Sequence, residues 1–161
     1  MPPRKTEGAP PDAEAIALRL LARREHARGE LAAKLRARGV SSADAAPVLD
    51  RLQAAGLLSD ARFVEQLLRT RLRQGYGPTR IRRDLAAKGV APGSEDTALA
   101  LGDEEWAARA EAIRRRHFGG DLPTEGAERS RQARFLERRG YAAAHIARVL
   151  RGDFEADSEL S

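Results

Sequence analysis

The chain has 161 residues, of which 42% are hydrophobic and 33% charged, and its formal net charge is +5. It contains no cysteine, which excludes disulfides, thiol catalysis and thiolate metal sites. Alanine and leucine dominate over the β-branched residues, so we expect an all-α protein. No apolar run approaches the ~20 residues that span a bilayer, and the start lacks a signal-peptide core. We therefore expect a cytoplasmic protein without a membrane contact.

The first part of the chain has the pattern of a short arm followed by three helices. Residues 1–12 contain four prolines and are expected to be disordered. Asp12 suits the N-cap of the first helix, and Ser41 with Asp44 resembles a capping box at the start of the third. We expect the first three-helix repeat over residues 13–55, with helices near 13–24, 28–38 and 42–55.

The second repeat is expected over residues 56–102. Ser59 or Asp60 caps its first helix, which ends near Arg73. Its second helix begins at Pro78, a residue favoured at the first helical position, and ends before Gly89. A third, weaker helix is expected after Ser94.

The third repeat is expected over residues 103–152. Its first helix starts at Asp103 and places Trp106 on the core face. A helix ending near Arg139 and another ending before Gly152 follow. Residues 153–161 carry four carboxylates and no basic residue, and we expect a mobile acidic tail. The full prediction is nine helices, three in each repeat.

Three helix-ending glycines mark these repeats. Gly39, Gly89 and Gly140 are separated by 50 and 51 residues, and each is followed by valine or tyrosine. Glycine at this position adopts the left-handed conformation that ends a helix. A motif recurring at such a period indicates an array of like units. We therefore predict an elongated array of three tandem three-helix repeats.

Arginine supplies all but three of the 29 basic residues, and it is the residue suited to binding phosphate and carboxylate groups. Arg62, Arg69 and Arg73 form a stripe along one predicted helix. A solvated or ion-paired surface position explains any single arginine equally well. As clusters, the candidate partner-binding residues are Arg62, Arg69, Arg73, Arg80, Arg82, Arg83, Arg114, Arg115, Arg116, Arg131, Arg134, Arg138 and Arg139.

No catalytic constellation accompanies these arginines. The chain has neither a phosphate-binding loop with Gly-Lys-Ser/Thr nor a Gly-x-Ser-x-Gly nucleophile elbow. The three histidines, His26, His117 and His145, are far apart in sequence and lack a paired ligand motif. We expect no enzyme activity, no cofactor and no metal.

Four motifs, in order, resemble those of the RecX family, the bacterial regulators of the RecA recombinase. They are Arg24-Glu25-His26-Ala27-Arg28, Gly56-Leu57-Leu58-Ser59-Asp60, Gly75-Tyr76-Gly77-Pro78 and Arg138-Arg139-Gly140-Tyr141. The resemblance covers about residues 14–151. Ala27 departs from the family, which often has serine there, so a helix cap is expected to be lost. Ser59 replaces a common acidic residue and keeps the ability to cap.

The resemblance implies a monomer that binds RecA filaments on single-stranded DNA and suppresses strand exchange, ATP hydrolysis and RecA-assisted repressor cleavage. An elongated basic array would suit a filament groove. Two other interpretations remain open. The chain could bind nucleic acid by itself, since a three-helix unit can place a helix in a major groove, or it could be a helical adaptor for another partner.

Overall fold

The computed structural model describes residues 10–96 and 99–153. These residues form eight helices and no strand, which confirms the all-α prediction. The predicted N-terminal arm and acidic tail lie almost entirely outside the described residues. Two compact units are distinguished: unit 1 consists of residues up to Phe63 together with Lys88–Val90, and unit 2 of Val64–Ala87 with the chain from Ala91 onward. The division into three repeats stays a prediction.

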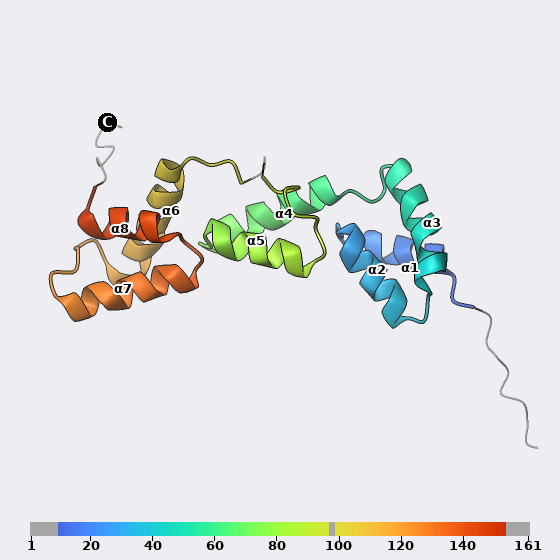
Figure 1. Cartoon of the computed structure of the whole chain (residues 1–161), viewed down its shortest axis with the longest axis horizontal. Helices are drawn as coiled ribbons and strands as arrows, with labels where there is room; N and C mark the ends of the chain where they lie inside the picture. The colour runs from blue at the N-terminus through green and yellow to red at the C-terminus, as the bar shows by residue number, and fades with distance from the viewer. Residues whose placement is uncertain (1–9, 97–98, 154–161) are drawn as a thin grey trace, which may run out of the picture. The chain divides into compact units, whose positions relative to one another are not determined.

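Unit 1 contains three helices, α1 (Ala13–Leu21), α2 (Arg28–Ala37) and α3 (Ser42–Ala54), and the first turn of α4 (Asp60–Arg73). Figure 1 shows α1, α2 and α3 grouped together. Their core is aliphatic, because helical spacing brings leucine and valine to the inner face of each helix. Its fully or nearly fully buried members include Ala17, Leu31, Leu35, Leu49, Leu52 and Leu58.

The helix starts of unit 1 follow the predicted capping, with one replacement. Asp12 and Ser41 each accept a hydrogen bond from the backbone N–H three residues later, both at 3.1 Å. Ala27 gives no side-chain cap to α2, as its sequence indicates. The carboxylate of Asp60 accepts the N–H of Arg28 at 2.7 Å instead, while Ser59 caps α4 by accepting the N–H of Arg62 at 3.2 Å. Of the two residues predicted to cap α4, Ser59 therefore caps α4 and Asp60 caps α2.

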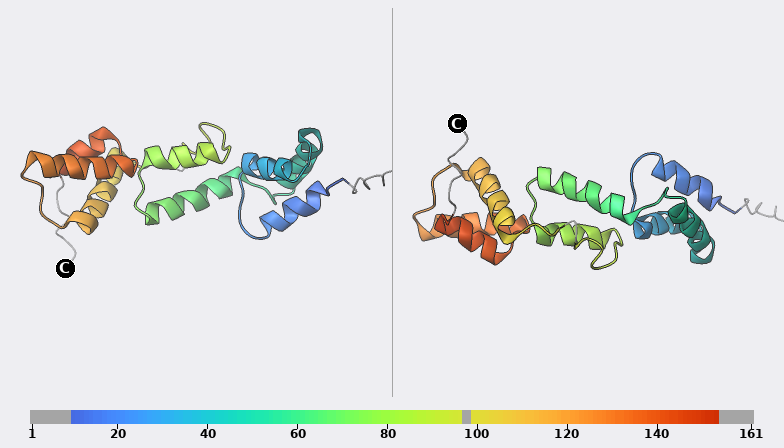
Figure 2. Two further views of the ribbon diagram at one scale, coloured as in Figure 1. Left: turned by 90° about the horizontal axis from the view of Figure 1, so that it is seen from below. Right: turned by 90° about the horizontal axis from the view of Figure 1, so that it is seen from above.

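Unit 2 contains most of α4, then α5 (Pro78–Ala87), α6 (Asp103–Phe118), α7 (Gly126–Arg138) and α8 (Ala143–Arg151). Figures 1 and 2 show α4 and α5 side by side, and α6, α7 and α8 as a second group. The second group encloses Trp106, Ala110, Leu136 and Val149, all buried. Phe118 packs edge-on against Phe135, with ring centroids 5.1 Å apart.

The predicted ninth helix, after Ser94, is absent from the described residues. Residues 92–96 form turns instead, and Gly93 has a φ of +88°. Pro92 and Gly93 leave only a short segment before Gly102, and a helix of this length is too short to be stable without strong packing. Leu99 is nevertheless buried, as expected from its apolar character. The prediction of nine helices is therefore wrong for this segment.

The repeated glycines end helices and also let helix ends meet. Gly39, Gly89 and Gly140 have φ values of +85°, +74° and +90°, which confirms their predicted conformation. In unit 2, the N–H of Gly77 donates to the carbonyl of Arg139 at 2.7 Å, and that of Thr79 to Gly140 at 3.0 Å. The end of α7 thereby accepts hydrogen bonds from the start of α5, which joins complementary ends of two helix dipoles.

A second close approach of glycines occurs in unit 1. A Cβ on Gly29, in the first turn of α2, would lie 2.8 Å from the Cα of Gly89. A Cβ on Gly89 would lie 2.9 Å from the Cα of Gly29. These backbones pack so closely that neither position has room for a methyl group.

Candidate functional site

The predicted arginine stripe of α4 divides into a part that forms an ion pair and a part that does not, and all three arginines are exposed. In unit 1, Arg62 donates from Nε to Glu25 at 2.8 Å and from its terminal nitrogen to the carbonyl of Gly56 at 2.8 Å. In unit 2, Arg69 and Arg73 are exposed and neither forms an ion pair within the described residues. Arg62 therefore contributes to the packing of unit 1.

Arg114 is a correction to the predicted contact surface. Its side chain is 0% exposed and ion-paired to Glu111 at 2.7 Å. The same guanidinium donates to the carbonyls of Gly120 and Asp121 at 3.2 and 3.1 Å. It holds the loop after α6 in place and has no surface left for a partner. Arg115, by contrast, is 61% exposed and pairs with the same Glu111.

Three other predicted arginines lie on α7. Arg134 and Arg138 are exposed. Arg131 pairs with Glu128 at 3.2 Å and lies over the ring of Phe118, 5.2 Å from its centroid. Arg82 and Arg83 are exposed on α5.

Tyr76, between α4 and α5, gathers three arginines around its ring. The guanidinium carbons of Arg71, Arg80 and Arg139 lie 5.6, 4.9 and 5.3 Å from the ring centroid, within the range of cation–π attraction. Asp84 pairs with Arg71 at 2.6 Å and with Arg80 at 3.1 Å. Arg139 forms no ion pair within the described part of the chain and donates to the carbonyl of Gln74 at 2.7 Å. One carboxylate thus pairs with two of the three cations around the ring.

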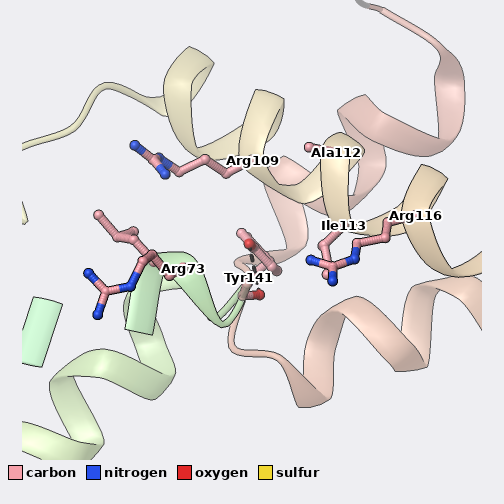
Figure 3. A pocket seen from close by; sticks show the side chains of 8 residues that line it. Arg73, Arg109, Ala112, Ile113, Arg116 and Tyr141 are labelled. Carbon is pink, nitrogen blue, oxygen red and sulfur yellow. Dashed lines mark hydrogen bonds between the residues drawn. The ribbon is translucent and has the colours of Figure 1, made fainter. Parts of the chain in front are cut away.

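Beside this cluster, unit 2 has a basic cleft made of two adjoining hollows, with volumes of about 170 and 500 Å³. Arg73, Ile113 and Arg116 line both. Figure 3 shows the smaller hollow, with Arg109 and Arg116 extending from α6 and Arg73 from the end of α4, around Tyr141. We call the two hollows together the arginine cleft; the larger hollow adds Gln74, Tyr76, His117, Phe135 and Arg139.

Tyr141 lines the smaller hollow of the arginine cleft. It is 4% exposed, and its hydroxyl donates to the carbonyl of Gly75 at 3.0 Å (Figure 3). Burial raises the pKa of Tyr141 to about 12, although the charges of Arg109 and Arg139 lower it in part. The phenol is therefore neutral at physiological pH and fixes the chain between α7 and α8 against the end of α4.

Arg109 was missed by the sequence analysis, although the sequence contains a signal for it. Arg109, Ile113 and Arg116 are spaced i, i+4 and i+7, so they share one face of α6. The run Arg114–Arg116 is conspicuous in the sequence, whereas Arg109 stands alone, although it shares a helix face with Arg116. The structure brings Arg73, Arg109, Arg116 and Arg139 together and keeps Arg114 inside.

Unit 1 has a charged cluster of a different kind, centred on the buried Glu30. Arg24 forms an ion pair with it, and Lys34 and Lys88 each approach it at 3.4 Å. Burial alone would raise the pKa of Glu30, but the hydrogen bond from Arg24 and the charges of Arg24 and Lys88 lower it to about 2. Every cation here has the same carboxylate partner, so the cluster ties Arg24, Lys34 and Lys88 to Glu30 within unit 1.

His26 lies next to this cluster and is 1% exposed. Its Nδ1 is 3.1 Å from the carbonyl of Arg24, and its Nε2 is 3.1 Å from the ammonium of Lys34. Burial lowers the pKa of His26 below its ordinary value. A neutral ring that donates to the carbonyl and accepts from Lys34 satisfies both nitrogens.

Unit 1 also has a basic hollow of about 330 Å³, which the sequence did not indicate. Arg19, Arg23 and Arg38 line it with Ile16 and Leu20. The described residues contain no group of three or more side chains that could hold a metal ion, and none of their helices is long and apolar enough to cross a membrane.

Comparison with known proteins identifies the family. Residues 13–52 match the model of the first three-helix domain of RecX, and residues 59–99 match that of the second. The regulatory protein RecX of Pseudomonas entomophila is 46% identical over 136 residues, which cover 84% of this chain and 88% of that protein. The chain belongs to the RecX family. The RecX proteins of Halorhodospira halophila and Acidithiobacillus ferrooxidans are 47% and 44% identical, over 81% and 91% of this chain and 81% and 93% of their own lengths.

Solved structures of RecX proteins share the fold. A crystal structure of RecX from Lactobacillus salivarius matches with a TM-score of 0.75 at 19% identity, covering 87% of this chain and 93% of that one. A second crystal structure of a regulatory protein RecX matches with a TM-score of 0.70 at 21% identity, covering 86% and 71% of the two chains. The helical architecture is thus that of RecX proteins.

Proposed function

We propose that this protein is a non-enzymatic regulator that binds RecA filaments on single-stranded DNA and inhibits strand exchange, ATP hydrolysis and RecA-assisted repressor cleavage. The observation that carries the proposal is membership of the RecX family, supported by 46% identity over 84% of the chain. We further propose that it acts in the cytoplasm as a monomer, in recombination, DNA repair and the SOS response.

The exposed arginines of unit 2 support a polyanionic partner. Arg69, Arg73, Arg82 and Arg83 lie on α4 and α5, and no carboxylate pairs with any of them within the described residues. Such uncompensated cations attract DNA phosphate and acidic protein surfaces from a distance and speed association. We propose these four, with Arg116, Arg134, Arg138 and Arg139, as contact residues.

A second candidate function is nucleic-acid binding without RecA. The arginine cleft favours it, because no carboxylate among the described residues lines either hollow. In that case affinity for naked DNA would account for all activity and would fall steeply with salt.

Co-sedimentation distinguishes the two functions. The protein is mixed with RecA filaments assembled on single-stranded DNA, and the bound protein is measured in the pellet. Two controls replace these filaments with RecA assembled without DNA and with single-stranded DNA without RecA. The proposal predicts that the protein binds the RecA–DNA filament more tightly than naked DNA at physiological salt, and that Arg69→Glu with Arg73→Glu weakens this binding without loss of helix content. Equal binding to naked DNA and to the filament would support the second function instead.

A further inference from the structure

We propose that the arginine cleft of unit 2 binds a single nucleic-acid strand through consecutive backbone phosphates, without contact to the bases. The inference rests on the proposed function, and it names the ligand group and the residues that hold it. The experiment that tests this inference contains no RecA. A negative result would therefore refute the proposed DNA site without refuting the proposed regulation of RecA.

Uncompensated charge is the first argument. Four guanidiniums line the cleft from three parts of unit 2: Arg73 on α4, Arg109 and Arg116 on α6, and Arg139 after α7. Arg116 forms no hydrogen bond or ion pair within the described chain, and Arg73 has only a 3.5 Å contact to the hydroxyl of Thr70.

Arg109 adds an unsatisfied donor to this charge. Its terminal nitrogen pairs with Glu105 at 3.1 Å, while its Nε is buried without a partner. Guanidinium groups that keep free donors in a concave site suit the paired oxygens of a phosphate. The cleft therefore has the donors of an anion site, and Glu105 is the one carboxylate that pairs with its guanidiniums within the described residues.

The aromatic rings of the cleft argue for backbone contact. Single-strand-binding proteins commonly stack bases on exposed aromatic faces. Here three guanidiniums already surround the ring of Tyr76. Phe135 is stacked by His117, with ring centroids 4.4 Å apart and planes at 14°, and Arg139 lies 5.2 Å from the same ring. A base would have to displace these partners, whereas a phosphate can approach the same cations from the open side.

The size and lining of the cleft favour a single strand over a duplex or a peptide. Its hollows, about 170 and 500 Å³, admit a sugar–phosphate chain but not the width of a duplex, which could touch only the rim. Ile113 is the one aliphatic residue among those that line the larger hollow. An acidic peptide would therefore find charge there but little apolar surface to bury.

The test is fluorescence anisotropy of a labelled thymidine oligomer at a series of salt concentrations, with the full chain and no RecA. The variant is Arg73→Gln with Arg116→Gln. Its matched control, Arg129→Gln with Arg151→Gln, removes the same charge from exposed positions of unit 2 that do not line the cleft. The cleft variant should lower the slope of log affinity against log salt by about 1.4, about 0.7 for each lost phosphate contact. The control should leave the slope near that of the unchanged protein.

An abasic oligomer of equal length tests the mode of contact. We expect its affinity to lie within about twofold of the thymidine oligomer, because stacking of even one base is worth about fivefold or more. Equal slopes for the cleft and control variants would overturn the site. Much weaker binding of the abasic oligomer than of the thymidine oligomer would overturn the contact through backbone phosphates. If a duplex or an acidic peptide displaced the labelled oligomer better than an unlabelled single strand does, the choice of a single strand as ligand would be overturned. Circular dichroism of each variant establishes that it is folded.

Discussion

The contact between Gly29 and Gly89 leads to a stability prediction with a control in the same unit. Gly89 and Gly39 both end helices with positive φ, at +74° and +85°, and both belong to unit 1. They differ in surroundings: a Cβ on Gly89 would lie 2.9 Å from the Cα of Gly29, whereas a Cβ on Gly39 meets nothing within 4 Å. Alanine at either position must adopt a left-handed conformation, at a cost of about 1–2 kcal/mol.

Only Gly89→Ala also forces two backbones apart. Overpacking of this kind costs about 1–3 kcal/mol more, since backbone atoms cannot rotate away. The effect of alanine on the unfolded chain is the same for both variants and cancels. Gly89→Ala should therefore lower the free energy of unfolding of unit 1 by at least about 1 kcal/mol more than Gly39→Ala. For a unit of this size that difference lowers the melting temperature by about 4–8 °C.

Urea and thermal unfolding, followed by circular dichroism, measure the difference. Gly29→Ala tests whether the change in the free energy of unfolding has the opposite sign to the usual one. Inside a helix, alanine is normally about 1 kcal/mol more favourable than glycine. Here its Cβ would lie 2.8 Å from Gly89, so the variant should be less stable than the original. Equal loss for Gly89→Ala and Gly39→Ala, or a gain for Gly29→Ala, would refute the close contact.

Three further predictions concern charges. Arg114→Met should destabilise unit 2 by about 3 kcal/mol or more, because it removes the buried donor that pairs with Glu111 and with two loop carbonyls, and Arg115→Met by less than about 1 kcal/mol, as measured by urea unfolding. Because the fold lowers the pKa of Glu30 to about 2, its stabilisation is complete above its ordinary pKa of 4.5 and is lost as the pH falls toward 2; Glu30→Gln should flatten the acid limb of a stability–pH curve. Removing residues 153–161 takes away four carboxylates and should raise affinity for single-stranded DNA at low salt, as measured by anisotropy, if the tail competes with phosphate; equal affinities would exclude that role.

Local signals in the sequence predicted most helix boundaries. The positive φ of Gly39, Gly89 and Gly140 follows from a residue type that alone adopts it freely. Asp12, Ser41 and Ser59 cap helices as their spacing indicates. The segment after Ser94 was predicted wrongly, because its apolar residues have helical spacing but Pro92 and Gly93 leave it too short.

The candidate site was harder to predict, since it depends on which side chains meet in space. An arginine is seldom buried without a partner, so the sequence favoured Arg114 as a surface residue. Only the fold shows Glu111 and the loop carbonyls around it. Arg109 and Arg139 line the two hollows of the arginine cleft from separate parts of unit 2, and no local pattern joins them. Asp60 likewise replaces the cap missing at Ala27 from a distance of 32 residues.

The central claim is that this protein regulates RecA, and the DNA-dependent ATPase of RecA tests it most directly. The protein is titrated into RecA assembled on single-stranded DNA, at ratios well below one molecule per RecA protomer. The account predicts that ATP hydrolysis falls strongly at these ratios, and that Arg69→Glu with Arg73→Glu moves the inhibition to higher concentrations. Unchanged hydrolysis at equimolar protein, together with tight binding to naked DNA in the same buffer, would contradict it.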